Sequence, residues 1–176
     1  MRLILLFLCT ILCVFFTYQN INAQIKFAVI GDYGDANDFE AAVSDMIDTW
    51  NVEFVITVGD NNYNNGYAST IDANIGKDYN QWIYPYSGSY PIGGPPGGSP
   101  DNINRFFPSL GNHDYANTIN PNAALPYLDY FELPGNERWY SFSWGNVDFF
   151  VLDSQLGWIP TTLAVQSDWL QNEVAN

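Results

Sequence analysis

The 176-residue chain is acidic, with 19 Asp and Glu residues against 5 Lys and Arg, and 47% of its residues are hydrophobic. This composition excludes a disordered chain, and the length suffices for one domain with a hydrophobic core. The shortage of Lys and Arg excludes the basic surface that binding to a nucleic acid backbone requires. The acidic balance serves solubility, and some of the carboxylates could also hold cations.

The first 23 residues are predicted to be a secretory signal peptide. Arg2 precedes an apolar run from Leu3 to Phe16, and Ala23 places a small residue before a cleavage point. The run is shorter than the roughly 20 residues of a membrane-spanning helix, so a membrane anchor is the weaker interpretation. Residues 24–176 would then form one secreted or periplasmic domain, with no stable membrane anchor after cleavage.

Both cysteines of the chain, Cys9 and Cys13, lie in this segment. No small residue stands directly before either of them, which argues against a lipoprotein. After cleavage the chain would hold no cysteine, so disulfides and thiolate metal sites are excluded. It would keep 4 Lys and Arg against 19 Asp and Glu, a formal charge of −15.

Two short apolar segments, residues 25–31 and 53–59, end in glycine and are predicted to be buried strands. Residues 37–50 between them are expected to form an amphipathic helix. Its apolar face would contain Phe39, Val43, Met46, Ile47 and Trp50, and its capping oxygens would come from Asp35, Asn37 or Asp38. Strand, helix and strand at this spacing indicate parallel strands joined by a right-handed crossover.

A long irregular region is expected from residue 60 to 105, with Pro and Gly concentrated at 91–100. One helix face could lie within it, formed by Ile71, Ile75, Tyr79 and Trp82. Its many aromatic residues favour a packed lid over a solvated linker. Further elements are then predicted: a third strand at 106–110, a hairpin of 139–144 and 147–153 around Gly145-Asn146, and a helix beginning at Gln166.

Residues that can bind a metal follow the ends of the first three strands, as Gly31-Asp32, Gly59-Asp60 and Gly111-Asn112. A single Gly-Asp pair is most often only a turn. The carboxyl ends of parallel strands share one edge of a sheet, so Asp32, Asp60 and Asn112 are expected to converge. Carboxylate and amide oxygens suit hard cations, and two metals roughly 3.5–4 Å apart can clamp a phosphate and activate water.

Three motifs, GDYG at 31–34, GDNNY at 59–63 and GNHD at 111–114, resemble in this order the first motifs of calcineurin-like metallophosphoesterases. Gly34 stands where most relatives carry a metal-binding His, and with Tyr63 it resembles the purple acid phosphatase branch. The resemblance runs from about residue 25 to the end of the chain. It implies an α/β fold, the amino-terminal half of a four-layer α/β/β/α sandwich. It also implies hydrolysis of small phosphate monoesters by metal-bound hydroxide, at a binuclear centre of iron with iron, zinc or manganese.

The resemblance assigns a role to each motif residue. Asp32 and Tyr63 would bind the first metal, a ferric iron whose tyrosinate charge transfer gives the purple colour, and Asp60 would bridge the two metals. Asn112 would bind the second metal. His113 would stabilise the transition state or protonate the leaving oxygen, with Asp114 orienting its ring. Loop or capping duty is expected for the nearby Asp35, Asn61, Asn62 and Asn64.

Three further histidine ligands of the family come from V-x-x-H and G-H-x-H segments, whereas His113 is the single histidine here. Those segments would follow the helix near Gln166, so we expect an incomplete copy with weakly held metals, impaired hydrolysis and exposed apolar sheet surface. One alternative is a non-catalytic secreted module that binds metal or contacts carbohydrate. A haloacid-dehalogenase-like hydrolase with Asp32 as nucleophile is disfavoured, because Asp32-Tyr33-Gly34 lacks the required Asp-x-Asp pair.

Overall fold

The computed structural model describes residues 24–90, 98–99, 101–115, 126–155 and 160–175. The predicted signal peptide with Cys9 and Cys13, and most of the Pro- and Gly-rich stretch, lie outside the described residues. Within the described ranges, none of the helices has the length and apolar character needed to span a membrane.

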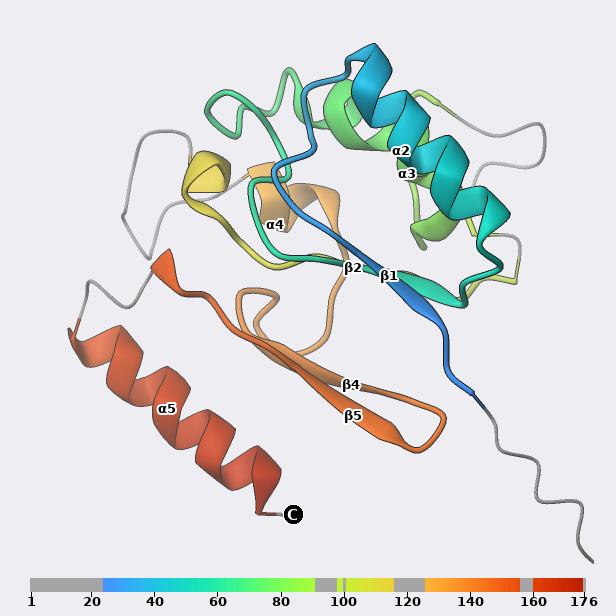
Figure 1. The fold of residues 1–176 in the computed structure, drawn as a ribbon. Helices are drawn as coiled ribbons and strands as arrows, with labels where there is room; N and C mark the ends of the chain where they lie inside the picture. Colours follow the sequence, from blue (N-terminus) through green and yellow to red (C-terminus); the bar gives the residue numbers. More distant parts are fainter. Residues whose placement is uncertain (1–23, 91–97, 100, 116–125, 156–159, 176) are drawn as a thin grey trace, which may run out of the picture.

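A small parallel sheet forms the centre of the molecule (Figure 1). It contains β1 (Phe27–Ile30), β2 (Phe54–Thr57) and β3 (Phe106–Phe107), in that order. Phe27 pairs with Phe54, and Val55 pairs with Phe106, both in parallel register. The prediction of parallel strands is confirmed, but β3 is shorter than expected because Pro108 lacks the N–H that a ladder needs.

Helix α2 (Asp38–Thr49) connects β1 to β2, and its start matches the expected cap. The side chain of Asn37 accepts hydrogen bonds from the backbone N–H groups of Phe39 and Glu40. The predicted apolar face is wrong in part, because Phe39 is 84% exposed while Glu40 is 4% exposed. Glu40 turns inward because its Oε2 accepts hydrogen bonds from the backbone of Asp35 and Ala36 just before the helix.

The aromatic-rich region between β2 and β3 is packed, as expected, and contains short helices. These are a π-helical turn η1 (Asp72–Gly76), α3 (Lys77–Tyr79) and η2 (Asn80–Trp82). Ile71, Ile75 and Tyr79 are buried in the main core, and Trp82 packs against it. Asp72 ties the region together by accepting hydrogen bonds from the Tyr86 and Tyr130 hydroxyls.

The remaining elements are α4 (Pro126–Tyr130), β4 (Tyr140–Trp144), β5 (Val147–Val151) and α5 (Pro160–Val174). Strands β4 and β5 form the expected antiparallel hairpin, and Gly145 in its turn has φ +60°. Helix α4 has no counterpart in the sequence prediction. Helix α5 begins at Pro160, six residues before the predicted start, where proline suits the first turn of a helix.

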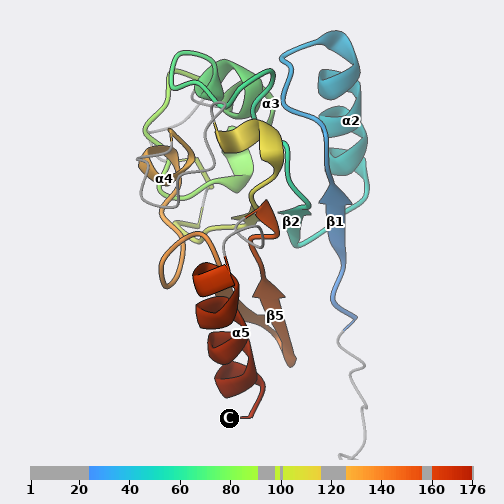
Figure 2. The ribbon, with the colours of Figure 1, turned by 90° about the vertical axis from the view of Figure 1, so that its left-hand side faces the viewer.

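Helices α2 and α3 cover one face of the parallel sheet, and the β4–β5 hairpin lies on the other (Figures 1 and 2). Phe142 of the hairpin stacks on Phe107 with ring centroids 3.6 Å apart. The ring of Phe150 meets Trp169 of α5 with centroids 6.5 Å apart, so the hairpin lies between the sheet and α5. This α/β arrangement is consistent with part of the sandwich that the motifs imply.

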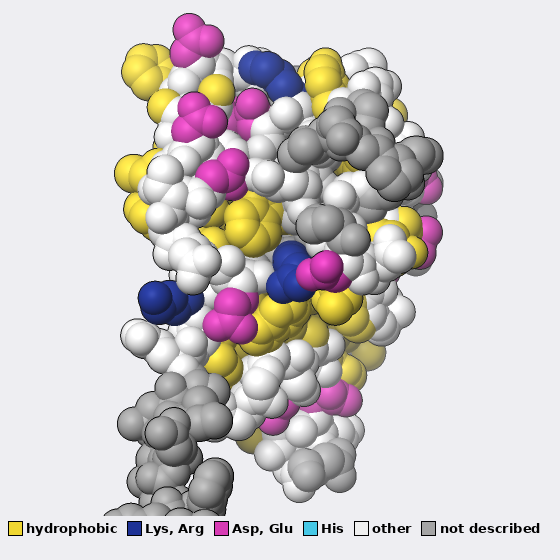
Figure 3. All heavy atoms as spheres, turned by 90° about the vertical axis from the view of Figure 1, so that its right-hand side faces the viewer, with side chains coloured by type: hydrophobic (Ala, Val, Ile, Leu, Met, Phe, Trp, Pro, Cys, Tyr) yellow, Lys and Arg dark blue, Asp and Glu magenta, His cyan; other side chains and the backbone are white. Residues whose placement is uncertain are grey.

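Apolar side chains on one flank of the sheet are exposed. Val29 on β1 is 54% exposed and Val58 after β2 is 65% exposed. On the face shown in Figure 3, cationic side chains stand apart from one another among acidic and hydrophobic ones. One of the cationic residues of the chain, Arg105, is held by Asp101 at 2.7 Å and lies over the ring of Trp144.

Candidate metal centre

Asp32 and Asp60 lie side by side, each in the loop that follows a strand of the parallel sheet. The backbone N–H of Asp32 donates to the carbonyl of Gly59 at 3.2 Å, which brings the two loops together. Both aspartates adopt left-handed backbone conformations, with φ 53° at Asp32 and φ 55° at Asp60. Such conformations are uncommon for residues other than glycine, and they concentrate at functional sites.

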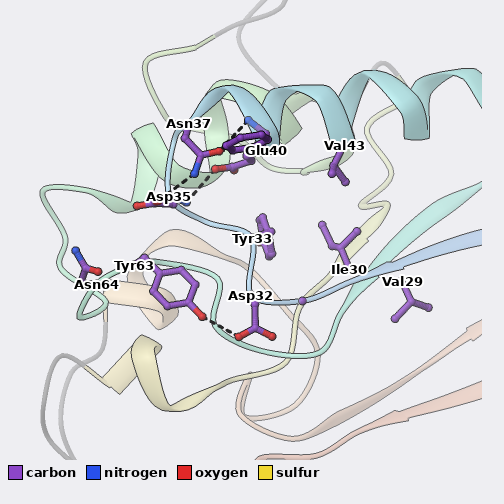
Figure 4. A pocket seen from close by; sticks show the side chains of 12 residues that line it. Val29, Ile30, Asp32, Tyr33, Asp35, Asn37, Glu40, Val43, Tyr63 and Asn64 are labelled. Atoms are coloured by element: carbon purple, nitrogen blue, oxygen red, sulfur yellow. Dashed lines mark hydrogen bonds between the residues drawn. The ribbon is translucent and has the colours of Figure 1, made fainter.

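Tyr63 joins the two carboxylates. Its hydroxyl donates to Asp32 Oδ1 at 2.8 Å (Figure 4) and lies 3.1 Å from Asp60 Oδ2. Burial of the phenol and its hydrogen bonds to both aspartates raise the pKa of Tyr63, so the proton is held between the oxygens. A cation in this place would have the opposite effect, because its charge favours the phenolate.

The third motif packs directly on Asp60. A Cβ on Gly111 would lie 2.2 Å from Asp60 Oδ1, and one on Gly59 would lie 2.9 Å from the Cα of Gly111, so the approach requires glycine at both positions. The backbone N–H of His113 donates to Asp60 Oδ1 at 2.9 Å. Asn112 is exposed at the start of this turn, and in the described structure its side chain makes no hydrogen bond to the other candidates.

The ring of His113 lies against Tyr63, with ring centroids 4.4 Å apart. Its Nδ1 lies 2.5 Å from the carbonyl oxygen of Asn64. In this structure the carbonyl of Asn64, and not Asp114, lies against the ring nitrogen, so a role of Asp114 in orienting the ring stays a prediction. Asp114 instead accepts hydrogen bonds from the backbone of Gly111 at 2.8 Å and from the backbone and side chain of Asn61.

Asp114 is almost completely buried, at 2% exposure. Burial raises the pKa of its carboxyl group to about 6, although the hydrogen bonds from Gly111 and Asn61 act in the opposite direction. A carboxylate with several N–H donors in such a place fixes the conformation of the backbone that carries it. In this structure Asp114 thus stabilises the conformation of the second and third motif loops through these hydrogen bonds.

Gly34 leaves no space for a side chain. A Cβ at this position would lie 1.7 Å from the backbone oxygen of Asn61. The carbonyl of Gly34 also accepts a hydrogen bond from the backbone N–H of Tyr63 at 2.7 Å. The loops after β1 and β2 therefore meet backbone to backbone, and Tyr63 supplies the oxygen next to Asp32.

A hollow of about 540 Å³ opens beside Asp32 and Tyr63. Figure 4 shows these two side chains at one end and Asp35, Asn37 and Glu40 at another. Its apolar wall comes from β1 and α2 and consists of Val29, Ile30, Phe39 and Val43. Such a hollow next to a polar cluster is the usual setting of a small-molecule site.

The donor chemistry of the cluster fits a hard cation. Two carboxylates and a phenol present three oxygens to one point, and iron and manganese accept such ligands. In the part of the chain that the structure describes, no group of three or more His, Cys, Asp and Glu side chains could hold a metal ion. The cluster at Tyr63 has two acidic members, Asp32 and Asp60, and its third oxygen comes from a phenol.

Asn61 is the residue that sequence reasoning missed. It was expected to serve a loop, yet it is fully buried and touches Tyr33, Thr57, Ser109 and Asp114. An apolar pattern cannot reveal such a residue. The available sequence signal was its place inside the second motif, directly after Asp60.

The family model described as calcineurin-like phosphoesterase matches residues 25–171, which is more than half of the chain. No curated protein and no solved structure matches the chain.

Proposed function

The chain belongs to the calcineurin-like phosphoesterase family, and we propose that it hydrolyses phosphate monoesters in the manner of the purple acid phosphatase branch. In this proposal Asp32 and Tyr63 hold one metal ion, Asp60 bridges two, and Asn112 contributes to the second. Iron is paired with iron, zinc or manganese. When bound, such a metal pair polarises the phosphate and supplies a nucleophile from water.

The arrangement of Gly34 and Tyr63 is the observation that carries the choice of branch. A histidine at position 34 would collide with the Asn61 carbonyl, which lies 1.7 Å from the place of a Cβ. The Tyr63 hydroxyl meets Asp32 and Asp60 at 2.8 and 3.1 Å. These contacts support the proposal that a phenol oxygen binds the metal where most family members use a histidine.

His113 is proposed to act on the phosphate ester itself. Its Nδ1 faces the Asn64 carbonyl, which favours a proton on Nδ1. When Nε2 also carries a proton, it can donate a hydrogen bond to an oxygen of the substrate. The ring would stabilise charge on the phosphate or deliver a proton to the leaving oxygen. The nearby hollow of about 540 Å³ would take the alcohol part of a small substrate.

Export through the apolar segment Leu3–Phe16 is part of the proposal, with residues 24–176 as the secreted or periplasmic domain. A secreted hydrolase would meet phosphate esters outside the cell or in the periplasm. Partial sequencing of the amino terminus of the exported protein would reveal Gln24 if this is right.

The test uses ferric iron as a probe, because an iron-bound tyrosinate absorbs visible light. The iron-loaded chain is expected to show this band and to hydrolyse an aryl phosphate, and Tyr63→Phe should remove the band. Tyr67→Phe is the matched control, since Tyr67 lies in the same loop and is 48% exposed. A band that survives in Tyr63→Phe would refute the assignment. Iron binding without turnover would favour the non-catalytic metal-binding module instead.

A further inference from the structure

Asn61 uses its whole hydrogen-bonding capacity inside the protein. Its Oδ1 accepts from the hydroxyls of Tyr33 at 3.1 Å and Thr57 at 2.5 Å. Its Nδ2 donates to the Ser109 carbonyl at 2.7 Å and to Asp114 Oδ2 at 2.9 Å. An amide side chain offers two donor hydrogens and two acceptor positions, so none is left over.

The partners of Asn61 come from all three loops of the candidate metal centre. Tyr33 directly follows Asp32, and Asn61 itself directly follows Asp60. Ser109 lies two residues before the third motif and Asp114 is its last residue, and the backbone N–H of Asn61 also donates to Asp114 Oδ1 at 3.0 Å. One buried amide therefore connects segments that are 28, 48 and 53 residues away along the chain.

We infer that Asn61 is a positioning residue, which holds the loops after β1, β2 and β3 in register so that their metal-binding side chains face one another. This inference rests on the proposed metal-dependent function. Asn61 does not itself reach the point where Asp32, Asp60 and Tyr63 meet. It acts through Tyr33 and Asp114, each of which lies within two residues of a proposed ligand.

The first test follows amide hydrogen exchange in the metal-free protein. Asn61→Ala leaves the Asp114 carboxylate and the Ser109 carbonyl without their side-chain donor, so exchange should accelerate in residues 31–35, 59–63 and 109–115 together. Asn80→Ala is the matched control. Asn80 is also buried, but its side chain donates at 2.6 Å to Gly76 within the region between β2 and β3. Its loss should accelerate exchange near residues 76–83.

The second test measures the affinity for Mn²⁺ alone by calorimetry. Removing a direct partner of a metal ligand typically costs about 10–100-fold in metal affinity. Asn61 acts one residue further out, so about tenfold, the lower end of this range, is expected for Asn61→Ala. Tyr33→Phe keeps the ring and removes one of the two hydroxyls on Oδ1, for a loss of about fivefold. Asn80→Ala should bind Mn²⁺ as the unchanged chain does, although its melting temperature falls.

Two outcomes would overturn the role of Asn61. One is equal acceleration of exchange throughout the protein in Asn61→Ala and Asn80→Ala. The other is unchanged Mn²⁺ affinity in a folded Asn61→Ala or Tyr33→Phe variant. If the unchanged chain binds no Mn²⁺ while exchange accelerates in the three loops only, the positioning of the loops by Asn61 stands and the proposed function fails.

Discussion

Two regions of this molecule reverse the usual pattern of burial: one buries polar side chains and the other exposes apolar ones. At the strand-end edge, where β1, β2 and β3 lead into the motif loops, Asn61 and Asp114 are 0% and 2% exposed. On the outer flank, formed by β1 and the outer face of α2, Val29 and Phe39 are 54% and 84% exposed. The polar side chains at the strand-end edge can be buried because each has hydrogen-bond partners there. The apolar side chains of the flank have few packing contacts in the described chain.

The contrast is sharpest at two neighbouring residues of α2. Glu40 is buried while Phe39 is exposed, because the turn before the helix fixes Glu40 by two backbone hydrogen bonds. Local polar contacts thus decided the rotation of this helix against its apolar pattern. The two regions should therefore respond differently to substitution, and four predictions test this difference.

The largest effect is expected at Asp60, which accepts hydrogen bonds from the Tyr63 hydroxyl and the His113 backbone. Asp60→Asn should lower both the affinity for Mn²⁺ and the rate of aryl phosphate hydrolysis by more than about 100-fold. Even the loss of a residue that only hydrogen-bonds a metal ligand can cost about 100-fold. Asp45→Asn on the exposed side of α2 is the control and should change neither. Retained hydrolysis in Asp60→Asn would sink the site assignment.

Gly34→Ala should destabilise the fold by about 3 kcal/mol, because the added methyl group meets a backbone that cannot move aside. The obstacle is the Asn61 oxygen, 1.7 Å from the position of the new Cβ. Gly31→Ala is the comparison: its Cβ would meet the side chain of Val58 at 2.6 Å, and Val58 is exposed and free to turn. Urea denaturation measures both, and equal costs would contradict the close contact of the two loops.

Glu40 should make stability depend on pH. Burial raises the pKa of Glu40 to about 7, and the charge of Asp78 raises it further. Hydrogen bonds from the backbone of Asp35 and Ala36 lower the pKa, as does the charge of Lys77. A raised pKa in the folded state means that Glu40 favours folding below the ordinary pKa of 4.5, and that this contribution is lost as the pH rises through about 7.

The loss should reach about 3 kcal/mol between pH 4.5 and 8, by the conversion of about 1.4 kcal/mol for each pKa unit. Glu40→Gln keeps an oxygen for the two backbone donors and carries no charge, so its unfolding free energy should lack this decline. Urea denaturation at several pH values measures the difference between the two proteins. Parallel curves would show that Glu40 is not the group responsible.

The smallest effect is expected on the outer flank. Phe39→Ser should change the unfolding free energy by less than about 0.5 kcal/mol, as exposed substitutions usually do. Phe106→Ala, at a residue that is 0% exposed, should cost about 3–5 kcal/mol. A large cost at Phe39 would mean that another part of the protein covers the flank.

The sequence alone determined the parallel strands, a polar cap before α2, the hairpin at Gly145 and the order of the three motifs. Each of these follows from a local pattern: a short apolar run, polar side chains before a helix, or a glycine at a turn. The pattern also predicted that Asp32 and Asp60 lie at one edge of the sheet, because the carboxyl ends of parallel strands share the same edge.

Only the tertiary structure decided the rotation of α2, the support of the motif loops by Asn61 and Asp114, and the partner of the His113 ring. Asn61 and Asp114 are 53 residues apart, and His113 and Asn64 are 49 residues apart. Hydrogen bonds over such separations leave no periodic trace in a sequence. They form because burial makes an unpaired polar group costly, so the folded chain brings each one a partner.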